Sequence, residues 1–482
     1  MFNCATGTIG PYVPSSTQPF DEQRARHLLR RAAYGANATR VQEVLTAGPE
    51  ATIDELLNEA IGAPLMTAPY WADWTIEDYD DFNAQRGIQY WHMVRAFVQD
   101  MHEHPLRARM TLFWHDHFVT EERVYDCGPY MFEYYRTLQQ YALGNFKEFV
   151  HDIGLTRAML VYLNGAENTK VAPNENYARE LYELFTLGAD NGYTQEDIVE
   201  TARALTGHTG YQTFCGDIGF NPYDWDPGLK TIFGQTYGFD YTGVIDNLFE
   251  QRAPQIATFI CGKLYRLFVH PEPEADIIAE LAQTLLDHDW EIAPVVGQLL
   301  RSEHFFDEAN FNAQIKSPYD LCIELSTVLD LNGGDDEYRN IYWATEFLGQ
   351  TLWNPPNVAG WPGNRAWINT STLSGRWEVV SWLMWTNKAQ TDAPYFRTFV
   401  QELMNDPMAS DPALITRTLV DHLIPGGLQN DIHYERATIV FKADVPQNYY
   451  DNNQWNMTWP SAHWQVYGLL EHIGTLPEFQ RY

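Results

Sequence analysis

Apolar residues recur at intervals of three or four positions through most of this chain, which is the spacing of one face of an α-helix. In residues 21–33, for example, alanine and leucine side chains share such a face, and Gly35 follows as a stop signal. Pro105 is expected to break the long periodic segment 89–119, because proline lacks the N–H that a helix interior uses. Comparable patterns predict helices at residues 41–60, 130–153, 174–187, 194–205, 254–268, 275–287, 292–302, 318–331, 338–348 and 461–473.

Apolar and polar residues never alternate, as they do in a half-buried β-strand, over more than a few residues. We therefore predict a mainly α fold, a multi-helical single globular body with long ordered loops and few short strands. Residues 209–241, rich in Gly, Pro and Asp, are predicted to form an ordered loop or short hairpins, and residues 352–374 a second loop. Residues 406–459 are acidic and are expected to be the least helical part. We predict a main helical body over residues 1–400 and a small acidic C-terminal appendage over residues 401–482, packed on it.

Composition and charge narrow the classes of function. Of the 482 residues, 45% are hydrophobic and 14% aromatic, which is ample for a large core and excludes wholesale disorder. Asp and Glu number 64 against 31 Lys and Arg, a formal charge of −33 that repels nucleic acid and anionic membrane surfaces. The sequence has no apolar run of the roughly 20 residues that a membrane span requires.

The cysteines give no metal or disulfide signature. They include no CxxC pair, so neither a cysteine zinc knuckle nor a dense disulfide framework has support. Two of them, Cys261 and Cys322, lie in apolar helical patterns and are predicted to be small core residues. The five are Cys4, Cys127, Cys215, Cys261 and Cys322.

The first motif with candidate chemistry is Phe-Trp-His-Asp-His-Phe at residues 113–118. Two histidines two positions apart cannot share one face of a regular helix. On an extended segment or a frayed helix end, however, the side chains of His115 and His117 would be able to bind the same metal ion. Imidazole is a common transition-metal ligand, and Asp116 would orient a ring or ligate. The alternative is an aromatic core in which the histidines make ordinary hydrogen bonds.

The second motif is Asn-Glu-Asn-Tyr-Ala-Arg-Glu-Leu-Tyr-Glu-Leu-Phe at residues 174–185. On a helix, Glu175, Arg179, Glu180 and Glu183 fall within one arc. Arg179 is positioned to pair with Glu175 or Glu183. Glu180 and Glu183 have the i, i+3 spacing by which helical bundles present carboxylates to a central ion. The alternatives are a solvated face and a metal-free ion-pair network that holds helices together.

Three further segments are candidates. A helix ends in Gly207-His208, and Asp226 lies in a loop that does not have the Walker order. The aromatic turn at residues 357–363 is predicted to be structural rather than a ligand contact. The sequence has no HExxH, GxSxG or GxGxxG motif, so the commonest metalloprotease, serine hydrolase and dinucleotide signatures are missing.

Taken in order, these motifs resemble the bacterial family named domain of unknown function 1800. The resemblance rests on HLLRRAAYG, FWHDHF, NENYARELYELFTLG and the helix that ends in ARALTG, with KSP, NVAGW and PEFQ further along. This chain departs from the family pattern at His208, where a tryptophan is usual, and at Trp225, where a histidine is usual. If that loop histidine serves chemistry in relatives, His208 compensates for it or the activity differs. Members often carry an export leader, and none is visible here, so the protein is expected to be cytoplasmic by default and exported by family analogy.

Together the motifs predict a divalent or transition-metal site. The expected metal ligands are His115, His117, Glu183 and Asp226, since mixed imidazole and carboxylate ligands suit iron, manganese, zinc or copper better than calcium. The expected catalytic residues are Glu175, Arg179, Glu180 and His208.

The predicted function is that of a metal-dependent enzyme, oxidative or hydrolytic, with an unknown substrate. One alternative is a carbohydrate- or polymer-binding protein, with a polysaccharide or small molecule as ligand. The other is a metal-free structural or assembly protein that works beside a protein partner. The tryptophans that suggest carbohydrate binding are Trp353, Trp361, Trp367 and Trp377.

Overall fold

The structure is a computed structural model, and it describes residues 7–210, 214–331, 333–392 and 394–482. Helices dominate it, and the strands found in these residues form two short hairpins, so the predicted mainly helical fold class is confirmed. The chain divides into two compact units. Unit 1 contains the described residues of Met1–Asp54, Arg301–Gln350 and Pro362–Tyr482, and unit 2 contains Glu55–Leu300 and Thr351–Trp361.

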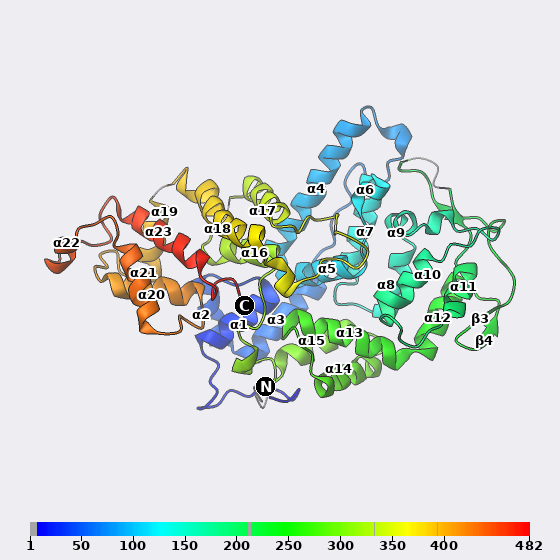
Figure 1. Cartoon of the computed structure of the whole chain (residues 1–482), viewed down its shortest axis with the longest axis horizontal. Helices are drawn as coiled ribbons and strands as arrows, with labels where there is room; N and C mark the ends of the chain where they lie inside the picture. Colours follow the sequence, from blue (N-terminus) through cyan, green and yellow to red (C-terminus); the bar gives the residue numbers. More distant parts are fainter. Residues whose placement is uncertain (1–6, 211–213, 332, 393) are drawn as a thin grey trace. The chain divides into compact units, whose positions relative to one another are not determined.

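The helices of unit 1 come from three stretches of the chain (Figure 1). Its first helices, α1 and α2, bury Leu29 and Val41 in a common cluster. Helices α20, α21 and α23, coloured orange to red in Figure 1, pack on one another, and α23 also contacts α18 and α19. The bounds are α1 Glu22–Ala33, α2 Ala38–Ala47, α16 Pro318–Val328, α17 Asp335–Phe347, α18 Thr370–Met384, α19 Tyr395–Leu403, α20 Pro412–Leu423, α21 Asp431–Phe441, α22 Gln447–Asp451 and α23 Ala462–Thr475. Helix α3 (Pro49–Gly62) begins in unit 1 and continues past Asp54 into unit 2.

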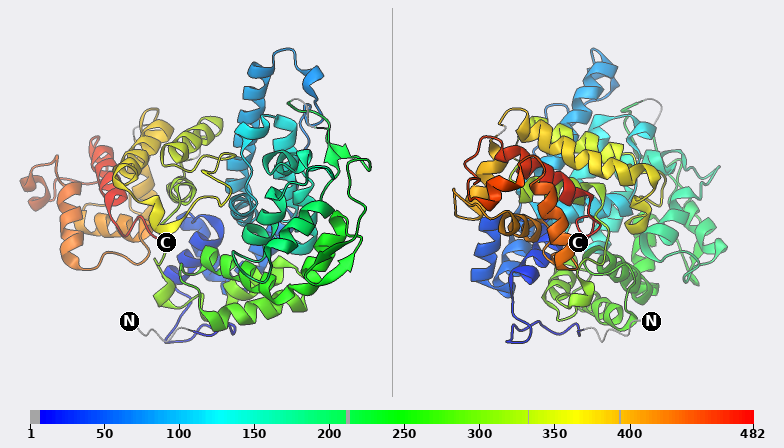
Figure 2. Two further views of the ribbon diagram at one scale, coloured as in Figure 1. Left: turned by 45° about the vertical axis from the view of Figure 1, so that its right-hand side comes forward. Right: turned by 60° about the vertical axis from the view of Figure 1, so that its left-hand side comes forward.

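Unit 2 is built around the helix pairs α4–α5 and α13–α14. The last two lie side by side in the views of Figures 1 and 2. Trp114 is fully buried and stacks on Phe146 with ring centroids 5.6 Å apart, which anchors α5 in this core. The bounds are α4 Phe82–Glu103, α5 Pro105–His117, α6 Glu122–Tyr125, α7 Gly128–Gln140, α8 Phe146–Gly154, α9 Arg157–Tyr162, α10 Asn176–Glu180, α11 Gln195–Ala204, α12 Tyr241–Gln251, α13 Ala253–Phe268, α14 Ala275–Asp287 and α15 Ile292–Arg301.

The hairpins lie in the segment that was predicted to be a loop or short hairpins. Strand β1 (His208–Thr209) pairs antiparallel with β2 (Gly219–Phe220), and β3 (Lys230–Ile232) pairs with β4 (Gln235–Tyr237). The part of this segment at residues 211–213 lies outside the described residues. Short turns of 3₁₀ and π helix complete the fold: η1 Ile76–Asp78, η2 Gly165–Glu167, η3 Leu181–Thr186, η4 Glu308–Asn310, η5 Asn364–Trp367 and η6 Trp385–Ala389.

Local sequence explains most helix ends. Asp21 caps α1 by accepting a hydrogen bond from the Arg24 N–H, and Pro105 begins α5, so the expected break at this proline is confirmed. Two predicted helices are wrong, because each is two helices. Segment 41–60 is divided at Gly48, where φ is 83° and α2 ends, and segment 130–153 is divided between α7 and α8. The prediction that residues 406–459 are the least helical part is also wrong, since α20, α21 and α22 lie there, whereas the described residues between α11 and α12 form hairpins and loops.

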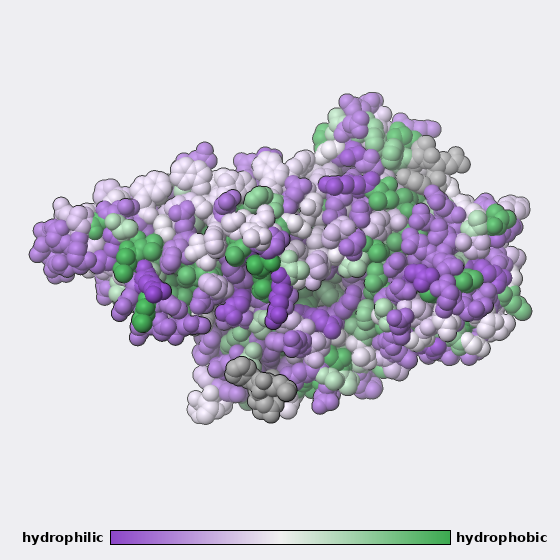
Figure 3. All heavy atoms as spheres, viewed as in Figure 1, coloured by the Kyte–Doolittle hydropathy of each residue, from purple (hydrophilic) through white to green (hydrophobic). Residues whose placement is uncertain are grey.

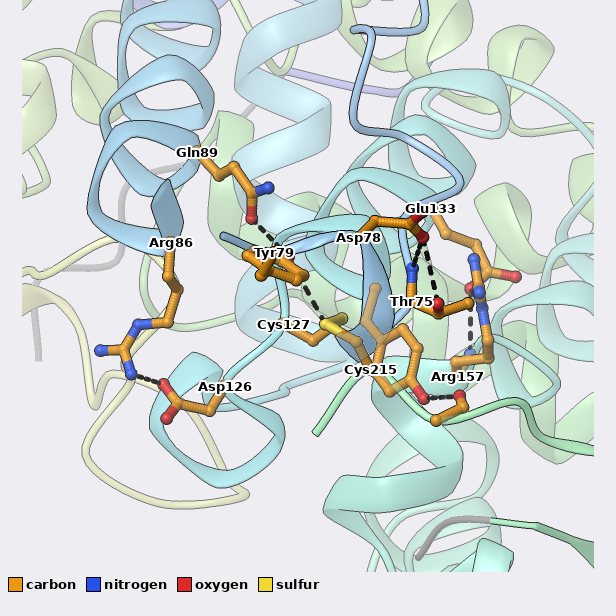
Figure 4. The surroundings of a disulfide bond; sticks show 12 residues. Thr75, Asp78, Tyr79, Arg86, Gln89, Asp126, Cys127, Glu133, Arg157 and Cys215 are labelled. Atoms are coloured by element: carbon orange, nitrogen blue, oxygen red, sulfur yellow. Dashed lines mark hydrogen bonds and ion pairs between the residues drawn. A yellow bond between two sulfur atoms is a disulfide. The ribbon is translucent and has the colours of Figure 1, made fainter. Parts of the chain in front are cut away.

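A disulfide bond between Cys127 and Cys215 joins the start of α7 to the loop after β1 (Figure 4). The two residues are 88 positions apart, and no spacing motif in the sequence predicts their pairing. The Tyr79 hydroxyl lies 3.6 Å from the Cys215 sulfur and donates a hydrogen bond to Gln89. Cys261 and Cys322 are free and buried as predicted, and Cys4 lies outside the described residues.

The surface is predominantly hydrophilic on the face in Figure 3, where hydrophobic residues lie in separate groups. This agrees with the formal charge of −33. Among the described residues, the helices are too short or too polar to cross a lipid bilayer.

Candidate functional site

Three of the sequence motifs meet in unit 2, at the C-terminal end of α5. This end carries His115, Asp116 and His117 in the last helical turn. Both histidines are buried, whereas Asp116 is half-buried. Since successive residues on a helix point about 100° apart, the three side chains face different neighbours.

His115 is held entirely by protein groups. The backbone N–H of Trp353 donates to its Nε2 over 3.1 Å, which places the ring proton on Nδ1. Nδ1 then donates to the Tyr134 hydroxyl over 3.0 Å, and that hydroxyl donates to the Phe118 carbonyl over 2.7 Å. Burial lowers the pKa of His115 to about 3, so the ring is neutral at physiological pH. No ring nitrogen of His115 keeps a lone pair for another ligand.

His117 is also fully engaged, with different partners. Its Nε2 donates to the Phe185 carbonyl over 2.9 Å, because a carbonyl oxygen can only accept. Its Nδ1 therefore accepts, and the Lys263 ammonium donates to it over 2.8 Å. Burial and the nearby charge of Lys263 hold the pKa of His117 well below its usual value. This histidine links α5 to η3 and to α13.

Asp116 lies between the two histidines in sequence and faces the loop at residues 351–361. The backbone N–H of Trp361 donates to its Oδ1 over 2.6 Å. Burial raises the pKa of Asp116 to about 6, although this hydrogen bond and the charge of Lys263 favour the ionised form. Burial lowers the pKa of Lys263 to about 8, and the negative charge of Asp116 opposes that shift. We call Asp116, His117 and Lys263 the polar cluster.

Gly360 makes the approach of the loop to Asp116 possible. Its φ is 82°, which favours glycine, and a Cβ there would lie 2.5 Å from the backbone oxygen of Asp116. The glycine of the NVAGW motif therefore has a steric role at this site. The aromatic turn, predicted to be structural, positions a backbone N–H on a half-buried carboxylate.

The Glu-rich motif contributes a backbone carbonyl group to the site. Its helix changes from α (α10) to π (η3) at Leu181, and π segments occur often at functional sites. The Phe185 carbonyl within η3 accepts the hydrogen bond from His117. The sequence predicted a helix here but not the π turn.

The glutamates of this motif mostly bind arginine. Arg179 pairs with both predicted partners, at 3.1 Å to Glu175 and 3.2 Å to Glu183, and these side chains are partly exposed. Glu180 is half-buried, and burial together with repulsion from Glu183 raises its pKa. The contacts match the ion-pair network that was weighed as an alternative.

His208 and Asp226 lie in the hairpin region of unit 2. His208 is half-buried on β1, its ring 5.5 Å from that of Phe220, and burial lowers its pKa. Asp226 pairs with Arg203 at 2.9 Å and accepts a hydrogen bond from the Gly228 N–H at 2.8 Å. Burial raises the pKa of Asp226, but these partners outweigh it and lower the pKa overall. Asp226 therefore anchors its loop on α11.

The predicted metal ligands are not gathered in this arrangement. Within the described ranges, no group of three or more His, Cys, Asp and Glu side chains is placed to hold a metal ion. His115 and His117 use their ring nitrogens elsewhere, and Glu183 and Asp226 bind different arginines. The metal site therefore stays a prediction without support from the geometry.

The tryptophans that suggested carbohydrate binding are mostly in the core. Trp353, Trp361 and Trp367 are buried, and Trp377 is exposed. Trp353 and Trp361 flank the His115 ring, with centroids 5.2 Å and 5.6 Å from it. These two side chains belong to the packing around α5 and are not available to a polymer.

Sequence reasoning missed Lys263. The position of this lysine in α13, between the buried residues Gly262 and Leu264, was the available signal, because a charge among buried residues requires a partner. Finding that partner needed the tertiary contact with His117, which is 146 positions away.

The motifs of unit 1 form a different kind of cluster. Glu324 pairs with Arg30 at 2.6 Å and with Lys316 at 3.0 Å, and all three side chains are almost completely enclosed. Arg376 donates to the Gln480 side chain over 2.6 Å and ties the C-terminal PEFQ segment to α18. HLLRR, KSP and PEFQ thus build a closed internal network, whereas Asp116 and Lys263 remain partly accessible. The polar cluster is therefore the candidate site.

Comparison with known proteins identifies a family whose function is unknown. Neither the curated proteins nor the solved structures include a significant match. One family model, described as "Protein of unknown function (DUF1800)", matches residues 27–481. The match covers most of the chain, and it includes the motifs that build the interiors of both units. The chain therefore belongs to the DUF1800 family.

Proposed function

We propose that the protein is an enzyme that performs acid–base chemistry on a small polar substrate at the polar cluster. One observation carries the proposal. The Lys263 ammonium donates to His117 Nδ1 over 2.8 Å, and both Lys263 and Asp116 are only half-buried. A lysine and a carboxylate beside each other, each with a pKa shifted towards neutrality by burial, are typical of catalytic sites.

The two groups are suited to opposite roles. With a pKa of about 6, Asp116 is largely ionised at pH 7 and accepts a proton. With a pKa of about 8, Lys263 is largely protonated at pH 7 and donates one. His117 is a positioning residue, because its lone pair holds the ammonium and its other nitrogen is fixed by Phe185.

The metal-dependent enzyme predicted from the sequence is the alternative. It requires an ion to replace Lys263 at His117 Nδ1, since the other nitrogen donates to Phe185. It also requires Glu183 to leave Arg179. Both changes would have to accompany binding of iron, manganese, zinc or copper. Measuring turnover with and without added metal distinguishes this alternative from the metal-free site.

Competitive labelling with acetic anhydride tests whether Lys263 is a reactive amine. Only the neutral amine reacts, so we expect Lys263 to be acetylated faster at pH 7 than the exposed Lys170, by about tenfold or more. In Asp116→Asn the onset of labelling should move to lower pH, because the carboxylate raises the pKa of Lys263. Glu167→Gln, an exposed change elsewhere in unit 2, should leave the onset unchanged.

Turnover tests the enzymatic role directly. Any reaction found in a panel of small esters, amides and carbonyl compounds should show limbs near pH 6 and pH 8. It should fall by about a hundredfold or more in Lys263→Met, but not in Lys147→Met, whose lysine pairs with Asp246 elsewhere. Equal turnover in both variants, or labelling of Lys263 no faster than Lys170, would overturn the proposal. Turnover that appears only with added metal and survives Lys263→Met would support the alternative.

A further inference from the structure

Unit 1 carries an exposed aromatic surface that the polar cluster does not involve. On α17, Trp343 is 44% exposed and Phe347 is 60% exposed. These two residues are four positions apart, so they share a face of the helix. Trp377 on α18 and Trp385 in η6 are exposed as well, and the Trp385 ring stacks on Trp464 with centroids 6.3 Å apart.

A groove runs between the exposed rings of α17 and the partly buried Trp382 of α18. Its volume is about 370 Å³, and it is lined by Trp343, Ala344, Phe347, Glu378, Val379 and Trp382. Ala344 and Val379 are the small side chains that leave this space open, while the large rings form its walls. A volume of this size is within the range of small-ligand sites.

The lining is mainly apolar: aromatic rings form its walls, Ala344 and Val379 its floor, and Glu378 is the one charged side chain among the lining residues. Indole and phenyl faces pack well against the C–H faces of sugar rings, and the carboxylate of Glu378 accepts hydrogen bonds from hydroxyl groups. Glu378 is exposed, and among the residues that the structure describes it has neither a hydrogen bond nor an ion pair. An apolar helix seated in the groove would bury this carboxylate without a partner, which is unfavourable, whereas a sugar chain would supply donors.

The net charge of the chain indicates which class of polysaccharide the groove would bind. A formal charge of −33 repels sulfated or uronic acid polymers, and Glu378 adds a negative charge inside the groove. From the rings, the unpaired carboxylate and this charge together, we propose that the groove binds a neutral polysaccharide. The site lies within unit 1 and is separate from the polar cluster, which belongs to unit 2.

Affinity electrophoresis of the full-length protein tests the proposal. The probes are hydroxyethylcellulose and soluble starch, as neutral β- and α-linked glucans, with dextran sulfate as the anionic polymer. We expect retardation by one of the neutral glucans and none by dextran sulfate. Trp343→Ala and Phe347→Ala should each weaken binding by about tenfold, because each removes a stacking face. Trp91→Ala, which changes an exposed tryptophan of unit 2, should bind like the parent.

Glu378→Leu separates the possible occupants. A sugar loses a hydrogen-bond acceptor and should bind more weakly, whereas an apolar protein partner gains contact area and should bind more tightly. The proposal is overturned if neither neutral glucan retards the parent, or if the ring variants are retarded as strongly as the parent. It is also overturned if the parent forms dimers that Trp343→Ala dissociates, because the occupant is then a second copy. Circular dichroism of each variant should match that of the parent, and we expect Phe347→Ala to fold because Phe347 is 60% exposed.

Discussion

A single glycine sets the position of the carboxylate in the polar cluster. Gly360 combines a φ of 82° with a backbone that touches Asp116. Any side chain would be strained by the dihedral and would also collide with Asp116. The two effects can be separated, because Gly234 of unit 2 has a φ of 79° with nothing near its missing side chain.

We predict that Gly360→Ala lowers the free energy of unfolding by about 2–4 kcal/mol, as strain and overpacking add. The matched change Gly234→Ala carries the strain alone and should cost about 1–2 kcal/mol. Urea denaturation measures both. Gly360→Ala should in addition shift the pH at which Lys263 is acetylated, because it displaces Asp116. Equal losses of stability in the two variants would contradict the steric role of Gly360.

At the scale of elements, sequence signals of helix ends were the most informative. Asp21 and Pro105 are found where capping and the lack of an N–H require them. The turn of π helix at η3 could not be predicted, because all six of its residues are compatible with an α-helix. The bond from His117 to Phe185 is a tertiary contact, and no local pattern encodes it. The motifs thus located the site, while the identity of its partners depended on packing.

The same reasoning predicts different costs for two residues that were expected to share a metal. Glu183→Gln should change stability by less than about 1 kcal/mol, because its ion pair with Arg179 is partly exposed. His115→Ala should cost about 2–4 kcal/mol, because it leaves a cavity and unpairs the buried Trp353 N–H.

Thermal melts with and without a chelator complete this test. We expect the chelator to leave the parent and both variants unchanged, since the ring nitrogens of His115 already have protein partners. A chelator that destabilises the parent but neither variant would instead show that His115 and Glu183 act together on one ion.

At the scale of the whole molecule, the disulfide was beyond sequence reasoning. Cys127 and Cys215 are 88 positions apart without a spacing motif, and folding alone brings their Cα atoms to 5.3 Å. Composition, in contrast, was sufficient to predict a large core.

We predict that reduction of this bond destabilises unit 2. In the chain-entropy model, a closed loop of this length contributes about 4.6 kcal/mol. Thermal melts of the parent should therefore shift downwards with reductant. The double variant Cys127→Ser, Cys215→Ser should melt at the lower temperature with or without reductant. Identical melting of the oxidised and reduced parent would show that the bond does not stabilise the fold. We expect the bond to persist only under oxidising conditions.

The ring that the disulfide closes has a consequence for how damage to the chain would be detected. It encloses α10, η3 and β1, together with the exposed Val171 beside the Glu-rich motif. A protease that cut the backbone at Val171 would leave two polypeptides joined through Cys127 and Cys215. On a gel without reductant, the nicked molecule would migrate near the intact chain, and the cut would become visible only after the sulfur–sulfur bond was broken. Preparations of this protein that pass as homogeneous need that second gel.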